Sequence, residues 1–202
     1  MNSLVSLAFL VILFLAAFVQ SGWPTPAYRA YAEQLIQNPP QSVVIRPDLE
    51  TLLDSLAKSA RLSKNRKAVV SSPEFKMLAR AQAIDMVLGD YVGHRSLKGY
   101  SFHARFAAFA SESEFYPARG ENAARERSGG TPGEAKARRL FDQWLRSSGH
   151  RRNLLSPSFD YVSSGVVQKG DHLYAVQVFW REKPAEEVSG GNVCVLWKCF
   201  EL

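Results

Sequence analysis

Residues 161–180 read YVSSGVVQKGDHLYAVQVFW, and this stretch decides the class of fold. Two runs rich in β-branched and aromatic residues, 161–168 and 172–180, stand on either side of Gly170 and Asp171. A glycine–aspartate pair between two such runs is typical of the turn of a β-hairpin. We therefore predict two antiparallel strands here, and GNVCVLWKCFEL at 191–202 predicts a further strand.

Upstream of the hairpin, three segments have the spacing of amphipathic helices. Apolar residues recur at helical intervals over 49–60 and again over 75–87, where Ser72 and Pro73 have the character of a helix start. The residues TPGE at 131–134 match a capping box and predict a helix from Ala135 to about Arg146. Helices followed by an antiparallel sheet indicate an α+β fold.

The first 46 residues divide into two parts. Residues 4–19 are almost entirely apolar, a length that suits the core of a signal peptide and is short for a membrane span. We predict a signal peptide or an N-terminal anchor over 1–21. Prolines recur between 24 and 40, so we predict a proline-rich linker over 22–46 with one short helix around 31–36. Residues 47–202 are expected to form the folded domain.

Composition and charge exclude several classes of protein. The chain of 202 residues is 46% hydrophobic and 22% charged, which argues against disorder and against multiple membrane spans. The net charge is +6 and the pI is near 9.4, but basic and acidic residues are interleaved, so no nucleic-acid partner is expected. Membrane contact is expected only through the N-terminal segment, if that segment stays uncleaved.

The two cysteines, Cys194 and Cys199, lie close together near the C-terminus. In an exported protein such a pair can form a disulfide. Residues five apart in a straight strand point to opposite faces, so the bridge needs a bend between them. We predict the disulfide and expect no zinc site here, because no CxxC or HxxxH partner accompanies the pair.

The four histidines differ in their surroundings. His172 borders the hairpin turn and is expected to be exposed, and His103 lies in the apolar run YSFHARF, where a packing role is expected. His94 and His150 each follow a glycine just after a predicted helix end, where side chains can gather over a shared cleft. These two are the candidate site residues.

Four motifs together closely resemble the bacterial branch of the CAP superfamily (SCP-like domain), which includes cysteine-rich secretory proteins, antigen 5 and pathogenesis-related plant proteins. They are EFKMLARAQAIDMVLGDYVGHRS at 74–96, GENAA at 120–124, WLRSSGHRRNLLSPSFDYVSSGVV at 144–167 and LYAVQVFW at 173–180. Each motif alone is weak, but their combination over roughly 47–181 is specific. The resemblance implies a three-layer α-β-α sandwich with a central antiparallel sheet.

The resemblance also implies a cleft formed by His94, Glu121 and His150. Asn153 falls where eukaryotic members usually carry glutamine, and Ser147 stands where the family has a second glutamate, a loss that many bacterial relatives share. Two imidazoles and one carboxylate suit a zinc ion with an open fourth position, and the same groups can serve acid–base chemistry. Glu121 has a structural alternative, as a buried carboxylate that locks the fold through backbone hydrogen bonds.

The expected protein is therefore an exported CAP-domain protein. It is secreted or periplasmic, or else anchored in the membrane and facing outward. We expect a binding module whose cleft takes a lipid, a cell-envelope component or a protein ligand, with no required cofactor and room for weak zinc binding. The alternative is a zinc-dependent hydrolase or protease that uses the same cleft residues, a role that Ser147 makes less favourable because a candidate general base is missing.

Overall fold

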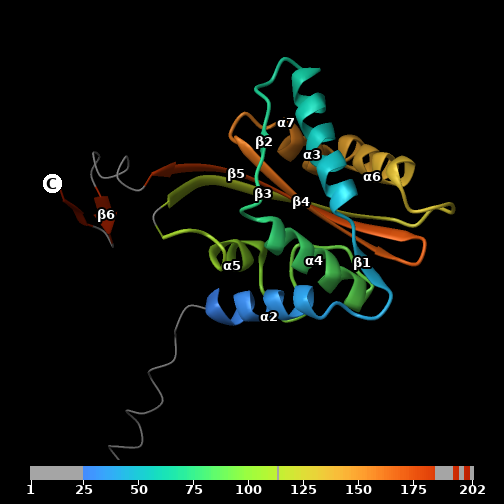
Figure 1. The fold of residues 1–202 in the computed structure, drawn as a ribbon. Coiled ribbons are helices and arrows are strands. Elements are labelled where there is room, and N and C mark those ends of the chain that lie inside the picture. Colours follow the sequence, from blue (N-terminus) through green and yellow to red (C-terminus); the bar gives the residue numbers. More distant parts are fainter. Residues whose placement is uncertain (1–24, 113, 185–192, 196–197, 201–202) are drawn as a thin grey trace, which may run out of the picture.

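The computed structural model describes residues 25–112, 114–184, 193–195 and 198–200. Their order along the chain can be followed in Figure 1. The elements are α2 (Thr25–Gln37), β1 (Val43–Ile45), α3 (Pro47–Leu62), β2 (Val70–Ser71), α4 (Lys76–Gly89), α5 (Phe102–Ala107), β3 (Glu114–Glu126), α6 (Glu134–Arg146), α7 (Ser148–Leu155), β4 (Tyr161–Lys169), β5 (His172–Pro184), β6 (Val193–Val195) and β7 (Lys198–Phe200).

The central sheet is built on the predicted hairpin. β4 and β5 pair antiparallel from Tyr161 opposite Trp180 to Lys169 opposite His172. Gly170 occupies the turn with a φ of 59°, a conformation that favours glycine. The strand order is β1-β4-β5-β3, and β2 pairs parallel to the start of β4. The hairpin and the α+β class are confirmed.

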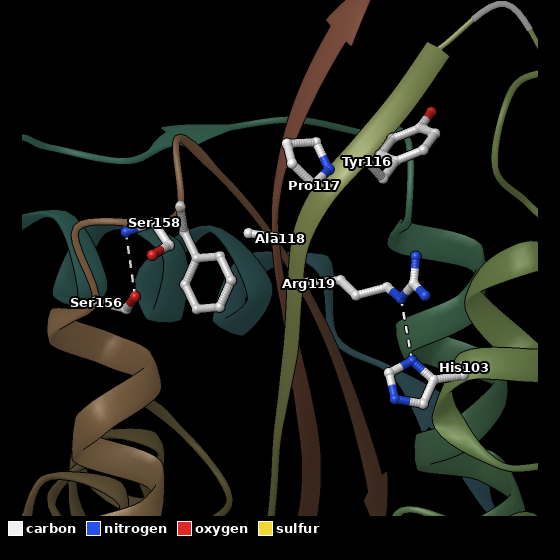
Figure 2. Close-up of a pocket in the computed structure, with 8 residues that line it drawn as sticks. His103, Tyr116, Pro117, Ala118, Arg119, Ser156 and Ser158 are labelled. Atoms are coloured by element: carbon white, nitrogen blue, oxygen red, sulfur yellow. Dashed lines mark hydrogen bonds between the residues drawn. The ribbon is translucent and has the colours of Figure 1, made fainter. Parts of the chain in front are cut away.

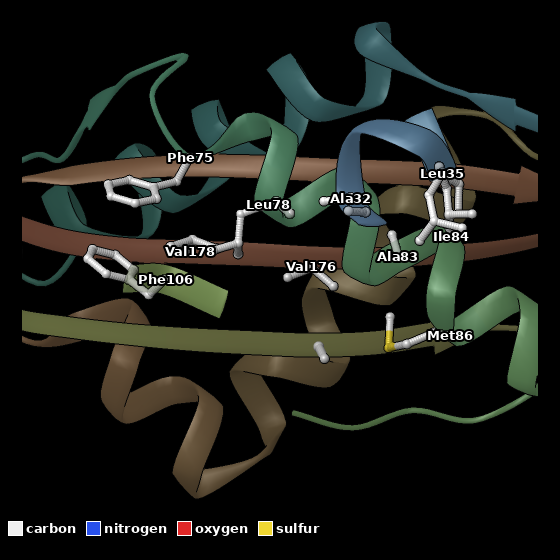
Figure 3. Close-up of a cluster of buried hydrophobic side chains, with 14 of the residues drawn as sticks. Ala32, Leu35, Phe75, Leu78, Ala83, Ile84, Met86, Phe106, Val176 and Val178 are labelled. Carbon is white, nitrogen blue, oxygen red and sulfur yellow. The ribbon is translucent and has the colours of Figure 1, made fainter. Parts of the chain in front are cut away.

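Helices cover both faces of this sheet (Figure 1). Along β5, Val176, Val178 and Trp180 join a core cluster with α2, α4 and α5, whereas Ala175 and Phe179 join a second cluster with α3, α6 and α7. This alternation is the period of two that a strand buried on both faces shows. Figure 3 shows the first cluster, between β5 and the helices that cover it. The implied three-layer α-β-α sandwich is confirmed.

The close approach of α4 to β4 depends on Gly165. A Cβ atom at this position would lie 2.3 Å from the backbone nitrogen of Arg80 and 2.4 Å from the carbonyl carbon of Ala79. Any other residue would push the helix off the strand. Gly165 therefore sets the depth of α4, and α4 leads directly into the loop that carries His94.

The predicted helices are present, but two of their starts differ from the prediction. α4 begins at Lys76, because the Ser72 hydroxyl accepts a hydrogen bond from the Glu74 backbone N–H in a preceding turn. The capping box at 131–134 does not form. Gly133 is the N-cap of α6 without a side-chain cap bond, and the Glu134 carboxylate pairs with Arg138 one turn later instead of reaching back.

The prediction of a linker over 22–46 is wrong for the part that the structure describes, although the short helix expected around 31–36 lies within a longer one. Residues 25–37 form α2, whose Tyr28 and Ala32 are buried in the core, and residues 43–45 form β1, which pairs with β4. Proline is tolerated in the first turn of a helix, so Pro26 does not oppose α2. The folded unit includes these elements.

The C-terminal region differs from the single strand that was predicted over 191–202. Instead of one strand, β6 and β7 form a separate two-stranded antiparallel hairpin in which Cys194 lies directly opposite Cys199. The hairpin is the bend that the predicted disulfide requires, and directly opposite residues have Cα separations within the range that a disulfide spans. The disulfide itself stays a prediction.

The predicted signal peptide or anchor over 1–21 lies outside the described residues. Within the part of the chain that the structure describes, no helix combines the length and the hydropathy of a membrane span.

Candidate functional site

The structure brings together the three residues of the expected cleft from three separate elements. His94 lies in the loop between α4 and α5, Glu121 lies in β3, and His150 lies in the first turn of α7. The rings of His94 and His150 are 6.4 Å apart between centroids and inclined by 67°. Residues that are far apart in sequence thus converge beside β3, an edge strand of the sheet.

His94 is oriented by Glu121. Its Nδ1 atom lies 2.8 Å from Oε1 of Glu121, whose side chain is 1% exposed, whereas the side chain of His94 is 52% exposed. An ionised carboxylate can only accept, so Nδ1 carries the proton and Nε2 is left as an acceptor. Glu121 therefore fixes both the direction and the tautomer of the imidazole.

Arg105 of α5 holds Glu121 in turn. Its Nη2 atom donates to both carboxylate oxygens, at 2.9 and 3.0 Å, and to the backbone carbonyl of His94 at 3.1 Å. Burial disfavours the guanidinium charge, but the adjacent carboxylate outweighs it, and the pKa of Arg105 lies above its ordinary value. The fully buried Arg105 thus links the helix, the strand and the histidine loop.

Sequence reasoning missed Arg105. Arginine is mostly a surface residue, so the residue types in YSFHARF do not predict that Arg105 is buried and paired. The spacing does contain an indication of its burial. Arg105 lies three residues after Phe102 and directly before the buried Phe106, so on a short helix it shares the face that packs against the core. The structural alternative for Glu121 takes a different form from the one expected. Its side chain is locked by a guanidinium rather than by backbone N–H groups.

The loop that carries His94 is tied to α4 at two points. The Asp85 carboxylate accepts hydrogen bonds from the Tyr91 hydroxyl and from the backbone N–H of Leu97, the latter at 2.8 Å. The Gln82 side-chain amide donates to the Gly93 carbonyl at 2.9 Å. Because Gly93 and Leu97 flank the histidine, its backbone is positioned by the body of the helix.

His150 is the less exposed of the two imidazoles. Burial lowers its pKa below the ordinary histidine value, and the nearby His94 lowers it further. At neutral pH the neutral form of His150 is therefore favoured. A neutral imidazole can both donate and accept a hydrogen bond.

Asn153 lies behind the cleft and connects α7 to β3. Its side-chain amide donates to the Glu121 carbonyl at 3.1 Å and to Oδ1 of Asn122 at 3.0 Å. Asn122 in turn donates to the carbonyl of His150 at 3.1 Å. The two asparagines hold the histidine-bearing helix against the outer edge of the sheet, and Asn122 is a second residue that sequence reasoning missed.

A cavity of about 380 Å³ opens beside His150. Ser147, the single residue between α6 and α7, lines it. The other residues that line it are Val92, Ala123, Ala124, Arg125, Gln143 and Trp144. A carboxylate at position 147 would therefore face this cavity and the imidazole of His150. The serine leaves the wall uncharged at that point.

The geometry does not fit Glu121 as a third zinc ligand. Arg105 bonds to both of its oxygens, and His94 bonds to one of them. A divalent cation bound there would lie against a buried guanidinium of the same sign of charge. Among the described residues, no three His, Cys, Asp or Glu side chains form a group that could hold a metal ion. Two imidazoles remain, fewer than the three protein ligands of a typical catalytic zinc site.

Comparison with known families assigns the chain to one of them. Residues 55–180, more than half of the sequence, match the model of the cysteine-rich secretory protein family, abbreviated CAP. The chain belongs to the CAP family. The matched span contains every cleft residue named above, from His94 to Asn153.

Three bacterial proteins are among those similar to this CAP domain. The uncharacterised protein YkwD of Bacillus subtilis is 27% identical over 115 residues, which cover 57% of this chain and 41% of YkwD. An outer surface protein of Borrelia burgdorferi has a TM-score of 0.57 at 18% identity, covering 67% of this chain and 94% of that one. An extracellular SCP-domain protein of Bacillus anthracis has a TM-score of 0.54 at 21% identity, covering 67% and 41%.

The two structural similarities support the fold of the CAP domain. The chain spans less than half the length of YkwD and of the Bacillus anthracis protein. These relatives therefore carry sequence beyond the shared domain.

Proposed function

We propose that this CAP domain is an extracellular binding module whose cleft takes a polar group of a cell-envelope component. The observation that carries the proposal is the commitment of Glu121 to Arg105 and His94. It fixes the imidazole of His94 next to His150, whose side chain lines the cavity, and this is a preorganised arrangement for recognition. Preorganisation raises affinity because fewer side chains must be ordered on binding.

Binding is favoured over hydrolysis by the state of the carboxylates. A general base needs a carboxylate or imidazole within reach of a water molecule and free to take its proton. Glu121 is buried and paired, and Ser147 provides no carboxylate. The imidazoles of His94 and His150 can still accept a proton, but Glu121 is committed to Arg105 and leaves a zinc ion two protein ligands, so the zinc-dependent hydrolase is the weaker interpretation.

The lining of the cavity favours a polar ligand group over an acyl chain. Arg125, Gln143, Ser147 and His150 supply charged and hydrogen-bonding groups on its wall. Arg125 and Gln143 already bond to Asp90 and Glu126, but an acyl chain would leave the side chains of Ser147 and His150 without partners, at a cost in free energy. The volume of about 380 Å³ lies at the small end of ligand pockets and suits one sugar unit or one short peptide segment.

An extracellular location is supported from two directions. The segment 4–19 has the composition of a signal-peptide core, and two proteins of similar fold are described as an outer surface protein and an extracellular protein. We propose secretion or a periplasmic location, with an outward-facing membrane anchor as the alternative. Mass determination of the N-terminus after expression with export separates the two, because cleavage near residue 21 removes the apolar segment.

No cofactor is required by this proposal. Zinc held by His94 and His150 alone would bind weakly, because two imidazoles are an incomplete set. Calorimetry with zinc chloride is expected to give a dissociation constant far above that of a structural zinc site, and tight binding would contradict the assignment of Glu121.

The proposal is tested by calorimetry with a soluble muropeptide, a disaccharide of the cell wall with its peptide stem. Binding is expected for the purified protein and for His172→Ala, and is expected to be lost in His150→Ala. Vesicles of phosphatidylglycerol serve as the lipid comparison. Turnover of the muropeptide or of an ester substrate, abolished by His94→Ala while the fold is kept, would contradict a binding role.

A further inference from the structure

A second hollow, of about 370 Å³, lies near the outer strand of the sheet, away from His150. Figure 2 shows it, with His103 of α5 and Arg119 of β3 on one side and the loop between α7 and β4 on the other. Ser158 and Phe159 of that loop line the hollow together with Pro117. Neither His94 nor His150 takes part in it.

β3 changes register beside the hollow. The pairing of β3 with β5 shifts between Phe115 and Ala118, which is the signature of a bulge, and Pro117 in this stretch has no N–H to donate. Further along, α7 covers the same edge, where Asn153 donates to the Glu121 carbonyl. Between the bulge and this cover, the edge of the sheet borders the open hollow.

Arg119 is held in place by two neighbours. Its Nε atom donates to Nδ1 of His103 at 3.0 Å, and its guanidinium lies over the ring of Phe106 at 5.6 Å from the centroid. Among the described residues Arg119 has no carboxylate partner, so its two terminal nitrogens retain their donors. Since Nδ1 of His103 accepts, the ring proton of a neutral His103 is on Nε2, which adds another donor.

The hollow combines this cationic side with an apolar one. Phe159 is 6% exposed and stacks on Phe179 with centroids 5.6 Å apart, so its ring is a rigid part of the wall. Pro117 and Ala118 add apolar surface, and none of the described residues that line the hollow is a carboxylate. A fixed guanidinium with unpaired terminal nitrogens is the arrangement that binds an oxyanion through two parallel hydrogen bonds.

We propose that this hollow binds the oxyanion of a ligand that also has an apolar body, with Arg119 as the anchor and Phe159 as the apolar contact. The oxyanion is a carboxylate or a group of the same geometry. It can belong to a free small molecule or to an anionic end of a cell-envelope component. The site is independent of the cleft at His94 and His150.

The four histidines make the test direct, because His103 lies at the hollow, His94 and His150 lie at the cleft, and His172 lies next to the hairpin turn. In a protein with ¹³C-labelled histidine, benzoate is expected to shift the ring signals of His103 and to leave those of His172 unchanged. Benzyl alcohol, which lacks the charge, and inorganic phosphate, which lacks the apolar body, are expected to bind at least about tenfold more weakly. A muropeptide serves as the probe for a carboxylate of a cell-wall polymer. A His103 shift with benzoate or with the muropeptide supports the site.

Arg119→Gln is expected to weaken benzoate binding by at least about tenfold, and Arg119→Lys to restore part of it, because lysine keeps the charge and loses the fork. Arg138→Gln is the matched control. It removes one positive charge from an exposed pair on α6 and is expected to leave binding unchanged. Unchanged His150 and His172 signals show that each variant is folded.

Two results would overturn the proposal. One is the absence of a His103 shift with both benzoate and the muropeptide. The other is benzoate binding that Arg119→Gln and Arg138→Gln weaken equally, since this would indicate general attraction to a basic protein. Shifts of His94 and His150 with the muropeptide report separately on the proposed cleft, so the two proposals can fail independently.

Discussion

Arg105 and Glu121 form a fully buried ion pair in which Nη2 lies 2.9 Å from one carboxylate oxygen and 3.0 Å from the other. The two side chains are 0% and 1% exposed. The pair joins α5 to β3, and Glu121 also bonds to His94. The position of the His94 ring therefore depends on a buried carboxylate whose charge Arg105 neutralises.

Removal of one partner of the pair should be strongly destabilising. Arg105→Met leaves the Glu121 carboxylate buried without its counter-charge, and the free energy of unfolding is expected to fall by about 3–5 kcal/mol. The double variant Arg105→Met, Glu121→Gln should regain part of this loss, because no uncompensated charge remains. Arg138→Gln, which breaks an exposed pair, should cost about 0.3–0.5 kcal/mol. Urea unfolding measures all three, and equal losses for Arg105→Met and Arg138→Gln would refute the role of the buried pair.

Glu121→Gln alone should change the tautomer of His94. The carboxylate requires the proton on Nδ1, whereas an amide can turn its N–H₂ group toward the ring and donate to an unprotonated Nδ1. We expect the ¹⁵N spectrum of His94 to move from the Nδ1–H form toward the Nε2–H form. The His172 spectrum, far from the substitution in the fold, is the internal control. An unchanged His94 tautomer would mean that another group orients the ring.

Acid should weaken the fold partly through His150. Because its pKa is lower in the folded protein than in the unfolded chain, the unfolded chain binds the proton first as the pH falls. The stability that depends on neutral His150 is present above the unfolded value of about 6.5 and is lost as the pH falls through the folded value. His150→Gln cannot titrate and should lose less stability than the parent between pH 8 and pH 5. Thermal unfolding at both pH values, with His172→Gln as the control, measures the difference.

Ser147→Glu should restore a carboxylate to the cavity wall. The new charge is expected to raise the pKa of His150, because an opposite charge favours the imidazolium, and to strengthen zinc binding. Ser148→Glu adds the same charge one residue further on, outside the residues that line the cavity, and should have the smaller effect on both quantities. Histidine NMR gives the pKa and calorimetry gives the zinc affinity. Identical results for the two variants would show that Ser147 has no special position.

The contact between α4 and β4 should not tolerate a side chain at Gly165. The Cβ atom of Gly165→Ala would meet the backbone of Ala79 and Arg80, which cannot move aside as a flexible side chain can. We expect a loss of about 1–3 kcal/mol or more. Gly149→Ala is the matched control, since its methyl group would meet no atom within 4 Å apart from its chain neighbours and the backbone of its own helix. A helical glycine replaced by alanine should gain up to about 1 kcal/mol. The unfolding free energies of the two variants should therefore change in opposite directions.

The sequence was sufficient for those parts of the fold that depend on local pattern. The hairpin at Gly170 and the helices over α3, α4 and α6 follow from spacing within one segment, and the motifs supplied His94, Glu121 and His150. The prediction of a linker is wrong because the prolines between 24 and 40 favour one locally, whereas the burial of the i, i+4 pair Tyr28 and Ala32 depends on α4 and is not visible locally. The helical conformation of residues 25–37 is therefore stabilised by tertiary packing.

The site residues that the sequence did not predict also depend on tertiary packing. Arg105 and Asn122 are polar residues whose partners lie 16 and 28 residues away, so their roles appear only when α5, β3 and α7 are assembled. The same holds for Arg119, which looks like an ordinary surface residue until His103 and Phe106 are placed beside it. Charged residues are expected at the surface. A buried charged residue depends on a partner that only the assembled fold brings next to it.

His94 and His150 are proposed to form a binding cleft that Arg105 and Glu121 hold in a fixed geometry, and a titration of the ¹³C-histidine protein with the muropeptide tests this most directly. We predict that the ring signals of His94 and His150 shift together and saturate, that the muropeptide stays intact, and that His172 does not respond. Unmoved signals of His94 and His150 at saturating muropeptide, or cleavage of the muropeptide during the titration, would contradict the proposed cleft.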